Sequence, residues 1–256
     1  MGGVPASRPL LEVVDLWKAF GGLVAVRGVT FQVAPGEILG LLGPNGSGKT
    51  TVFNLIAGAL QPWRGRVLLD GQEITGLRAS ARTRLGIGRT FQLVRAFGHL
   101  SALENVLVAR LYGADRPATL PAAAQEAREL LALVGLRDRA DQPAGLLNLG
   151  QRKRLELARA LAGRPRLLLL DEPLAGLNPT EVQEALTLLR RLRREGMTIL
   201  IVEHNLLAVR SLCDRAVVLN SGEVIAAGHP QAVLEDPQVV EVYLGRRDQL
   251  RQRGPA

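Results

Sequence analysis

The chain has 256 residues, of which 47% are hydrophobic and only 4% aromatic, so one large or two modest domains with an aliphatic core are expected. No apolar run reaches the roughly 18 residues that a membrane-spanning helix needs, and residues 1–9 lack the apolar segment of a secretion signal. Cys213 is the only cysteine, which excludes an internal disulfide and fits a reducing cytoplasm. The formal net charge of +8 is compatible with nucleic acid or an anionic membrane face. We interpret it as an arginine-rich composition, because no stretch mixes basic and aromatic side chains as a platform for stacked bases would.

The first part of the chain alternates short apolar stretches with turns. Residues 11–16 and 24–33 are expected to be strands, and residues 37–42 form a compact apolar strand followed by a glycine-rich loop. A helix is predicted over 50–60, ending near Gly58 with Pro62 just beyond. Another strand is predicted over 66–70, before the turn at Asp70-Gly71.

The glycine-rich loop carries the strongest functional signal. Its glycines allow successive backbone N–H groups to point at phosphate oxygens, a lysine adds a positive charge, and a hydroxyl is available to Mg²⁺. The next helix directs its positive N-terminal end at the same anion. We therefore predict that nucleotide is bound by Gly43, Pro44, Asn45, Gly46, Ser47, Gly48, Lys49, Thr50 and Thr51.

The middle of the chain changes character. Residues 103–111, 122–134 and 151–162 carry apolar side chains at helical spacing, with Gly135 ending the second helix, so a helical subdomain over about 93–163 is predicted within a strand–helix framework. Buried parallel strands are then expected at 167–170 and 198–202, with an amphipathic helix over 181–195 that ends at Gly196.

Two acids follow the apolar strand at 167–170. A carboxylate at the C-terminal end of a buried strand lies at the site edge of an α/β sheet. Asp171 is therefore a candidate Mg²⁺ ligand, and Glu172 is a candidate to orient or deprotonate the attacking water. The alternative is an ordinary pair of acids at a strand end, which the phosphate loop upstream makes less favoured.

The stretch Leu147-Asn148-Leu149-Gly150-Gln151 precedes the helix at 151–162 and resembles the signature Leu-Ser-Gly-Gly-Gln of the ATP-binding-cassette family. Asn148 stands where the family has Ser, and Leu149 where it has the first Gly. The resemblance implies that Asn148, Leu149, Gly150 and Gln151 form a signature that acts on a nucleotide held by a second subunit, with Asn148 and Gly150 closing over its γ-phosphate. Asn148 is equally suited to cap its own helix, and both roles are compatible.

Other residues occupy the family's functional positions in the same order. The resemblance implies that Gln92 approaches Mg²⁺ and the lytic water, that His204 contacts the γ-phosphate, and that Phe20, located 23 residues before Gly43, stacks on adenine. Lys49 counts among the catalytic residues, and Thr50, Gln92 and Asp171 among the metal ligands. Each has a structural alternative: a surface polar residue for Gln92, a structural histidine for His204 and a core aromatic for Phe20. The stretch that ends at Asn178 resembles the family's Ser-Ala-Leu-Asp stretch along the dimer seam, with Asn178 in place of the Asp. Asn178 also begins a helix well.

The resemblance spans nearly the whole chain and implies an α/β fold: a phosphate-loop NTPase (RecA-like) core with a small antiparallel β subdomain and the inserted helical subdomain. Residues 10–246 would form a single ATPase domain, and residues 247–256 a basic tail. The implied protein hydrolyses ATP with Mg²⁺ at composite sites of a dimer and powers an importer from the cytoplasmic face of the cell membrane. Its partners would be a second ATPase subunit, two permease subunits and an extracytoplasmic solute-binding protein, with no nucleic acid.

Several stretches resemble the ATPases of branched-chain amino-acid importers more specifically. They are Gly88-Arg89-Thr90-Phe91-Gln92, Leu103-Glu104-Asn105-Val106, Ala175-Gly176-Leu177-Asn178-Pro179, Gly228-His229-Pro230 and Tyr243-Leu244-Gly245. Import of branched-chain or related amino acids is therefore favoured. Urea and short-chain amide importers remain alternatives, as do a soluble nucleic-acid- or ribosome-associated ATPase and a regulatory subunit that binds ATP without turnover.

Overall fold

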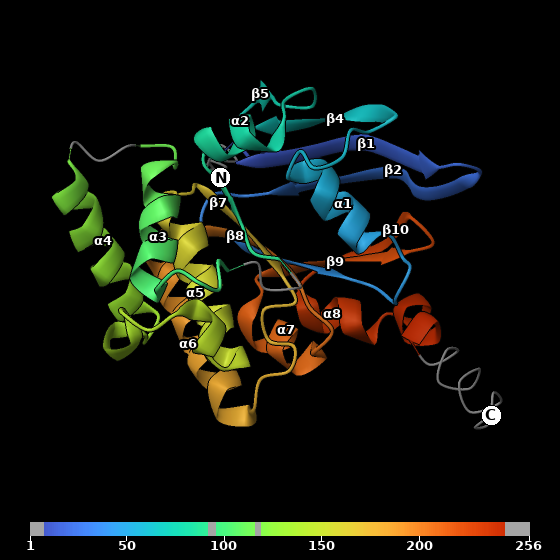
Figure 1. Ribbon diagram of the computed structural model, residues 1–256. Coiled ribbons are helices and arrows are strands. Elements are labelled where there is room, and N and C mark those ends of the chain that lie inside the picture. The colour runs from blue at the N-terminus through green and yellow to red at the C-terminus, as the bar shows by residue number, and fades with distance from the viewer. Residues whose placement is uncertain (1–7, 92–95, 116–118, 244–256) are drawn as a thin grey trace, which may run out of the picture. The chain divides into compact units, whose positions relative to one another are not determined.

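The computed structural model describes residues 8–91, 96–115 and 119–243 (Figure 1). Gln92, a predicted site residue, and the predicted basic tail at 247–256 lie outside these residues. The chain divides into two compact units, one comprising Met1–Gly76 and Leu200–Ala256 and the other Leu77–Ile199. The strands form a four-stranded sheet of order β2-β1-β4-β5 and a six-stranded sheet of order β10-β9-β3-β8-β7-β6. The predicted α/β class with a small antiparallel sheet is confirmed.

The four-stranded sheet lies in the first unit. It contains β1 (Leu11–Phe20), β2 (Leu23–Val33), β4 (Arg64–Leu69) and β5 (Gln72–Glu73), and every pairing is antiparallel. Leu11, Val13 and Leu16 of β1 are fully buried, whereas their neighbours are partly exposed. The strand thus buries one face in the core, as alternating strands of antiparallel sheets do.

The strand before the phosphate loop is β3 (Ile38–Leu42), and it is buried along its whole length. It pairs in parallel with β9 (Arg215–Asn220), which pairs antiparallel with β10 (Glu223–Gly228). The unit also holds α1 (Lys49–Ile56), α7 (Leu206–Leu212) and α8 (Pro230–Glu235). The predicted extension of α1 to residue 60 is wrong, but the predicted stop near Gly58 is confirmed. Gly58 adopts φ 76°, and the amides of the next two residues both donate to the Asn54 carbonyl.

Cys213 closes α7 and is buried behind β3. A Cβ added at Gly40 of β3 would lie 3.1 Å from the Cys213 Sγ, so the two segments are in close contact. Burial, reinforced by the negative charges of Asp214, Glu203 and Glu37, raises the pKa of the Cys213 thiol to about 12. The thiol therefore stays protonated at neutral pH.

The second unit contains α2 (Ala79–Arg84), β6 (Ile87–Arg89), β7 (Leu167–Asp171) and α6 (Pro179–Arg194). β6 and β7 pair in parallel, as the sequence predicted for the strand at 167–170. β8 (Thr198–Val202) is fully buried and lies across the division between the units. Gly196 follows the C-terminal end of α6, and its φ of 92° and N–H bond to the Arg193 carbonyl confirm the predicted glycine after the helix.

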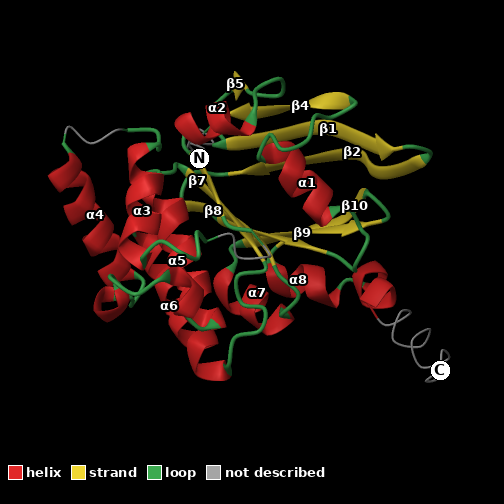
Figure 2. Cartoon of the chain, in the orientation of Figure 1, coloured by secondary structure: helices red, strands yellow, loops and turns green. Residues whose placement is uncertain are grey.

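The predicted helical part is confirmed by α3 (Ala102–Leu111), α4 (Leu120–Leu133) and α5 (Leu149–Ala162), which pack pairwise in the second unit (Figure 2). Two 3₁₀ turns, η1 (Arg137–Arg139) and η2 (Ala144–Leu146), connect α4 to α5. The core shared by α3, α4 and α5 includes Val106, Leu131 and Leu155, each fully buried. In the part of the chain that the structure describes, no helix is both long and apolar enough to cross a bilayer.

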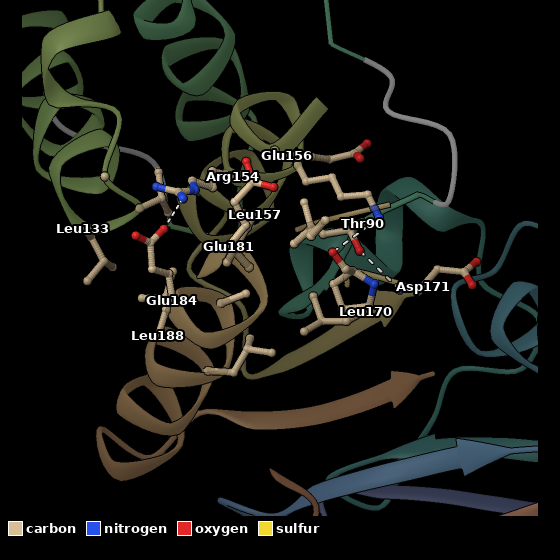
Figure 3. A pocket seen from close by; sticks show the side chains of 18 of the residues that line it. Thr90, Leu133, Arg154, Glu156, Leu157, Leu170, Asp171, Glu181, Glu184 and Leu188 are labelled. Atoms are coloured by element: carbon tan, nitrogen blue, oxygen red, sulfur yellow. Dashed lines mark hydrogen bonds and ion pairs between the residues drawn. The ribbon is translucent and has the colours of Figure 1, made fainter. Parts of the chain in front are cut away.

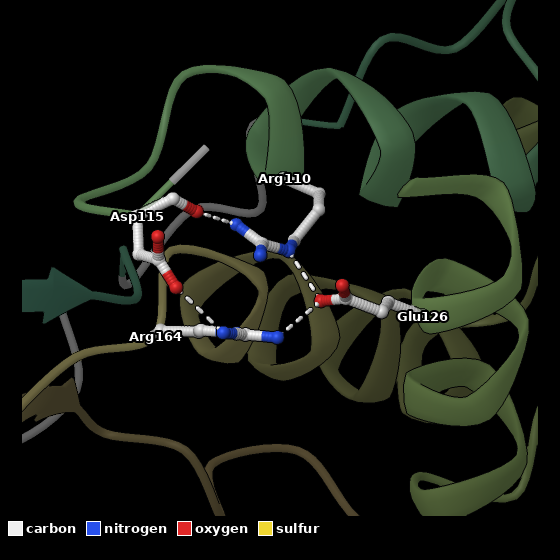
Figure 4. Close-up of polar contacts among 4 residues, drawn as sticks. All are labelled: Arg110, Asp115, Glu126 and Arg164. Atoms are coloured by element: carbon white, nitrogen blue, oxygen red, sulfur yellow. Dashed lines mark hydrogen bonds and ion pairs between the residues drawn. The ribbon is translucent and has the colours of Figure 1, made fainter. Parts of the chain in front are cut away.

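An ion-pair network ties the three helices together (Figure 4). Arg110 of α3 is 1% exposed and its Nε lies 2.5 Å from an oxygen of Glu126 on α4; a second nitrogen of its guanidinium bonds to the Asp115 carbonyl. Arg164, just after α5, pairs with Glu126 at 2.9 Å and with Asp115 at 2.6 Å. The hydrogen bond from Arg110 is the main cause that lowers the pKa of Glu126.

Candidate functional site

The phosphate loop connects β3 to α1 in the first unit, and its backbone accepts no side chain at two positions. Gly43 has φ 141° and Gly48 has φ 103°. A Cβ at Gly43 would lie 2.1 Å from the Leu219 carbonyl oxygen of β9, and one at Gly48 would lie 2.6 Å from the Ala25 carbonyl oxygen of β2. Glycine is therefore required for this conformation on steric grounds.

The polar groups inside the loop fit a bound phosphate chain. The Lys49 Nζ is buried and donates to the carbonyls of Gly43 at 2.7 Å and Pro44 at 2.9 Å. The Ser47 Oγ is buried and has no hydrogen-bond partner among the described residues. A charged ammonium and an unsatisfied hydroxyl at the start of a helix are suited to an anion. The residues present thus fit the nucleotide that the sequence predicted.

Other predicted nucleotide contacts also lie in the first unit. Thr50 is exposed in the first turn of α1, next to the less exposed Thr51. Phe20 ends β1 with 47% of its surface exposed, and the Lys18 Nζ lies 5.5 Å from its ring centroid. His204 follows β8, is exposed, and donates its backbone N–H to the Glu203 carboxylate at 3.2 Å. Because Phe20 is exposed, the alternative prediction that it packs in the core is wrong.

The acid pair ends β7 in the second unit. Asp171 is 4% exposed; its backbone N–H donates to the Thr90 Oγ1 at 3.3 Å, and its carboxylate lies 3.5 Å from an Arg89 nitrogen. Glu172 has the left-handed φ of 48°, and its carbonyl accepts from the Lys153 Nζ at 2.7 Å. The sequence alone indicates no role for Arg89 or Lys153. The only signal available for Arg89 was its position in a strand just before the predicted site glutamine.

The signature segment begins α5. The Asn148 side-chain oxygen accepts from the Gln151 N–H at 2.8 Å, and the Gln151 side chain accepts from the Asn148 N–H at 3.0 Å. This reciprocal capping box confirms the prediction that Asn148 caps its own helix. Asn178 caps α6 in the same way with Glu181, as its sequence context indicated. A Cβ at Gly150 would lie 2.3 Å from a Glu181 oxygen, so the starts of α5 and α6 are in contact.

A cavity of about 330 Å³ lies in the second unit beside Asp171 (Figure 3). Its walls are mainly aliphatic, from Leu157 of α5, Leu188 of α6 and Leu170 of β7, and the ion pair between Arg154 and Glu184 spans α5 and α6. The charged lining residues are mostly acidic: Lys153, Arg154, Glu156, Asp171, Glu181 and Glu184. An acidic, aliphatic cavity does not suit a triphosphate, so the phosphate loop remains the candidate anion site.

Comparison with known proteins identifies the family. A family model described as ABC transporter matches residues 26–175, and one described as branched-chain amino acid ATP-binding cassette transporter matches residues 223–249. The chain therefore belongs to the ABC transporter family, and its fold and phosphate loop are those of an ATPase of this class.

Three relatives place the chain within that family. It is 43% identical to the high-affinity branched-chain amino acid transport ATP-binding protein BraF of Pseudomonas aeruginosa, over 93% of this chain and 99% of the relative. It is 42% identical to the lipopolysaccharide export system ATP-binding protein LptB of Acidithiobacillus ferridurans, over 94% of this chain and 99% of that relative. The crystal structure of the ADP conformation of MJ1267, an ATP-binding cassette of an ABC transporter, matches with TM-score 0.84 and 32% identity, over 93% of this chain and all of that one.

Proposed function

We propose that this chain is the ATP-hydrolysing subunit of an importer for branched-chain or related amino acids. The observation that carries the proposal is the match of residues 223–249 to the C-terminal family model of branched-chain amino-acid cassettes, beyond the general cassette at 26–175. The similarity to BraF supports it. Because LptB is nearly as similar, a lipopolysaccharide export ATPase is the second candidate.

Each residue of the site has a proposed role. The loop around Lys49 binds the phosphates, Phe20 stacks on adenine and His204 contacts the γ-phosphate. Glu172 orients or deprotonates the attacking water, since a carboxylate is a general base at neutral pH. The roles are supported by the phosphate loop's geometry and by the resemblance of these positions to the family pattern.

Thr50, Gln92 and Asp171 are the residues that we propose to hold Mg²⁺. Their hydroxyl, amide and carboxylate oxygens are the hard donors that this ion prefers. When bound, the ion would neutralise phosphate charge. The guanidinium of Arg89, 3.5 Å from the Asp171 carboxylate, already balances the charge of that buried acid and would exchange this role with the metal.

Two copies of the cassette, or this chain and a paralogue, are proposed to close over ATP. In that arrangement, Asn148, Leu149, Gly150 and Gln151 of one subunit complete the site formed by the phosphate loop of the other. Hydrolysis would let the subunits part and so drive two permease subunits in the membrane. The chain would sit on the cytoplasmic face, and an extracytoplasmic binding protein would deliver the solute.

Co-purification tests the proposal directly. The chain is expressed with branched-chain amino-acid permease subunits from the same organism, and the complex is reconstituted into vesicles. Uptake of radiolabelled leucine is measured with its binding protein outside the vesicles and ATP enclosed within them. ATP-dependent leucine uptake is expected. Stimulation of the ATPase by lipopolysaccharide, with no uptake of any aliphatic amino acid, would instead support the export role.

A further inference from the structure

The C-terminal segment contacts the phosphate loop directly. The backbone N–H of Gly43 donates to the Tyr243 hydroxyl oxygen at 2.9 Å, across 200 residues of sequence. Both residues belong to the first unit. Tyr243 also opens the stretch Tyr243-Leu244-Gly245 that the sequence reading singled out, and it lies within the C-terminal family match at 223–249, where the proposed function gives it no role.

The position of Tyr243 is fixed by a short helix over 237–243. Asp236 begins this helix: its carboxylate accepts from the Gln238 N–H at 2.8 Å, and its carbonyl accepts from the Val240 N–H at 2.9 Å. Val239 is 1% exposed and anchors one face of the helix in the core. Tyr243 follows four residues later, on the same face, so the anchor directs its side chain inward.

The hydrogen bond satisfies a group that would otherwise be orphaned. Gly43 is buried at the end of β3, where the ladder of strand hydrogen bonds stops and the loop begins. A buried backbone N–H needs a partner, and the Tyr243 oxygen supplies it. Burial raises the pKa of the Tyr243 hydroxyl, with the bond from Gly43 acting in the opposite direction, so the group remains neutral at physiological pH.

The end of the phosphate loop next to α1 is held by different residues. The Gly222 N–H, in the turn between β9 and β10, donates to the Ser47 carbonyl at 3.0 Å, and the Gly222 carbonyl accepts from the Arg27 N–H of β2 at 2.8 Å. Ser47 is therefore fixed by the backbone alone. The Gly43 N–H depends on one side chain, that of Tyr243, so a single substitution can loosen this end of the loop.

We propose that Tyr243 is a positioning residue for the phosphate loop and that, through it, the C-terminal helix sets the affinity of the subunit for nucleotide. The hydroxyl bonds to the backbone of the loop's first residue, not to a side chain that we propose to act in hydrolysis. ATP and ADP affinity should therefore depend on it equally, and the hydrolysis step itself should not. The proposal requires nucleotide binding only and is independent of which solute is transported.

Tyr243→Phe removes the hydroxyl and keeps the ring. The expected result is a dissociation constant for ADP, and a KM for ATP, that rise together by about threefold to tenfold, because the ordered loop is less populated. The kcat at saturating ATP should change by less than about twofold. Tyr112→Phe is the matched control, since Tyr112, the only other tyrosine, is 70% exposed in the second unit; its nucleotide affinity should equal that of the parent.

Unchanged ADP affinity in Tyr243→Phe overturns the proposal, even if the melting temperature falls, because the residue would then be structural only. A fall in kcat with unchanged KM overturns it as well. If the variant does not fold, the unaltered protein provides the test by amide hydrogen exchange measured by NMR. The Gly43 amide should exchange far more slowly than that of Gly46, an exposed residue of the same loop, and equal rates would contradict the hydrogen bond.

Discussion

The phosphate loop and the start of α5 are both glycine-containing segments that lead into helices, yet they are fixed by different means. In the phosphate loop, backbone atoms of β2 and β9 press on Gly48 and Gly43 and leave no room for a Cβ. At the start of α5, the helix is capped by its own side chains, Asn148 and Gln151, and Gly150 faces a flexible Glu181 carboxylate.

This difference predicts how each segment responds to substitution. The backbone carbonyls of β2 and β9 cannot move without disturbing their strands, whereas the Glu181 carboxylate can rotate away at a modest cost. The phosphate loop should therefore fail abruptly when it is altered, and the start of α5 should be adjustable. The asymmetry fits the proposed roles, in which the loop holds the nucleotide and the signature segment would engage and release the nucleotide of the partner subunit in each cycle.

Gly43→Ala should have the largest effect. The added methyl group would lie 2.1 Å from the Leu219 carbonyl oxygen, so the loop or β9 must move. Nucleotide binding should weaken by at least about a hundredfold, measured by titration with a fluorescent ATP analogue. Gly76→Ala is the control, because a Cβ there meets nothing within 4 Å. Near-normal binding in Gly43→Ala would show that the loop is not held by its neighbours.

Glu172→Gln tests the chemistry that depends on the second unit. If Glu172 is the base, turnover should fall by about a hundredfold or more while ATP binding is retained, because the amide cannot accept a proton. Phosphate release measures turnover, and size-exclusion chromatography with ATP should reveal a stabilised dimer. Hydrolysis at the parental rate would remove Glu172 from the role of base.

Gly150→Ala should have a smaller effect, of a different kind. The methyl group would displace the Glu181 carboxylate, which lies 2.3 Å away and also accepts from the Asn178 N–H. Nucleotide binding by the isolated subunit should be unchanged, and turnover should fall by about tenfold through a weaker contact with the partner's nucleotide. Combining it with Glu181→Ala relieves the clash, so recovery in the double variant would indicate a purely steric cause.

Two substitutions of Asn148 distinguish its capping of α5 from its proposed contact with the nucleotide. Asn148→Ala loses the cap and should cost about 1 kcal/mol, lowering the melting temperature by about 2–4 °C. Asn148→Ser retains a cap and introduces the family's usual residue, so it should melt within about 1 °C of the parent. The ratio of turnover between the two variants, measured at saturating ATP, then reports the nucleotide contact. Equal turnover would leave Asn148 with a capping role only.

Glu126→Gln is the mildest change and tests the ion pairs of the helical part. Because the hydrogen bond from Arg110 lowers the pKa of Glu126 in the folded state, its stabilising effect is present above the ordinary glutamate pKa of about 4.3. It is lost as the pH falls through the lowered value. The variant should therefore melt below the parent at pH 7, with a difference that persists down to about pH 4.3 and shrinks as the pH falls further. A constant difference would mean that charge is not involved.

The sequence predicted best those features that depend on neighbouring residues. The start of α6, with Asn178 as cap, Pro179 in the first turn and Glu181 completing the box, was readable because all three lie within four positions. The strands next to the phosphate loop and acid pair were likewise visible as short apolar runs. Local patterns carry these features because caps and buried strands obey local rules.

Features that depend on distant contacts were missed. The hydrogen bond between Gly43 and Tyr243 joins residues 200 positions apart, and no local pattern encodes it. α2 was not predicted because its sequence is polar, although Arg82 within it is fully buried and donates to the Leu77 carbonyl at 3.0 Å. Burial lowers the pKa of Arg82 to about 10, an environment that a polar sequence does not suggest. The end of α1 was placed too late, although a stop near Gly58 was expected, because the apolar residues continue to Leu60.

The buried thiol of Cys213 makes this ATPase a convenient framework for spectroscopic labelling. Its raised pKa and its burial beside β3 leave almost no thiolate to react with maleimides at neutral pH. A probe can therefore be attached to a newly introduced surface cysteine without first removing the native one. One label near the phosphate loop and another on α4 would report, by distance measurements between spins or fluorophores, whether their separation changes during a cycle of ATP binding and hydrolysis.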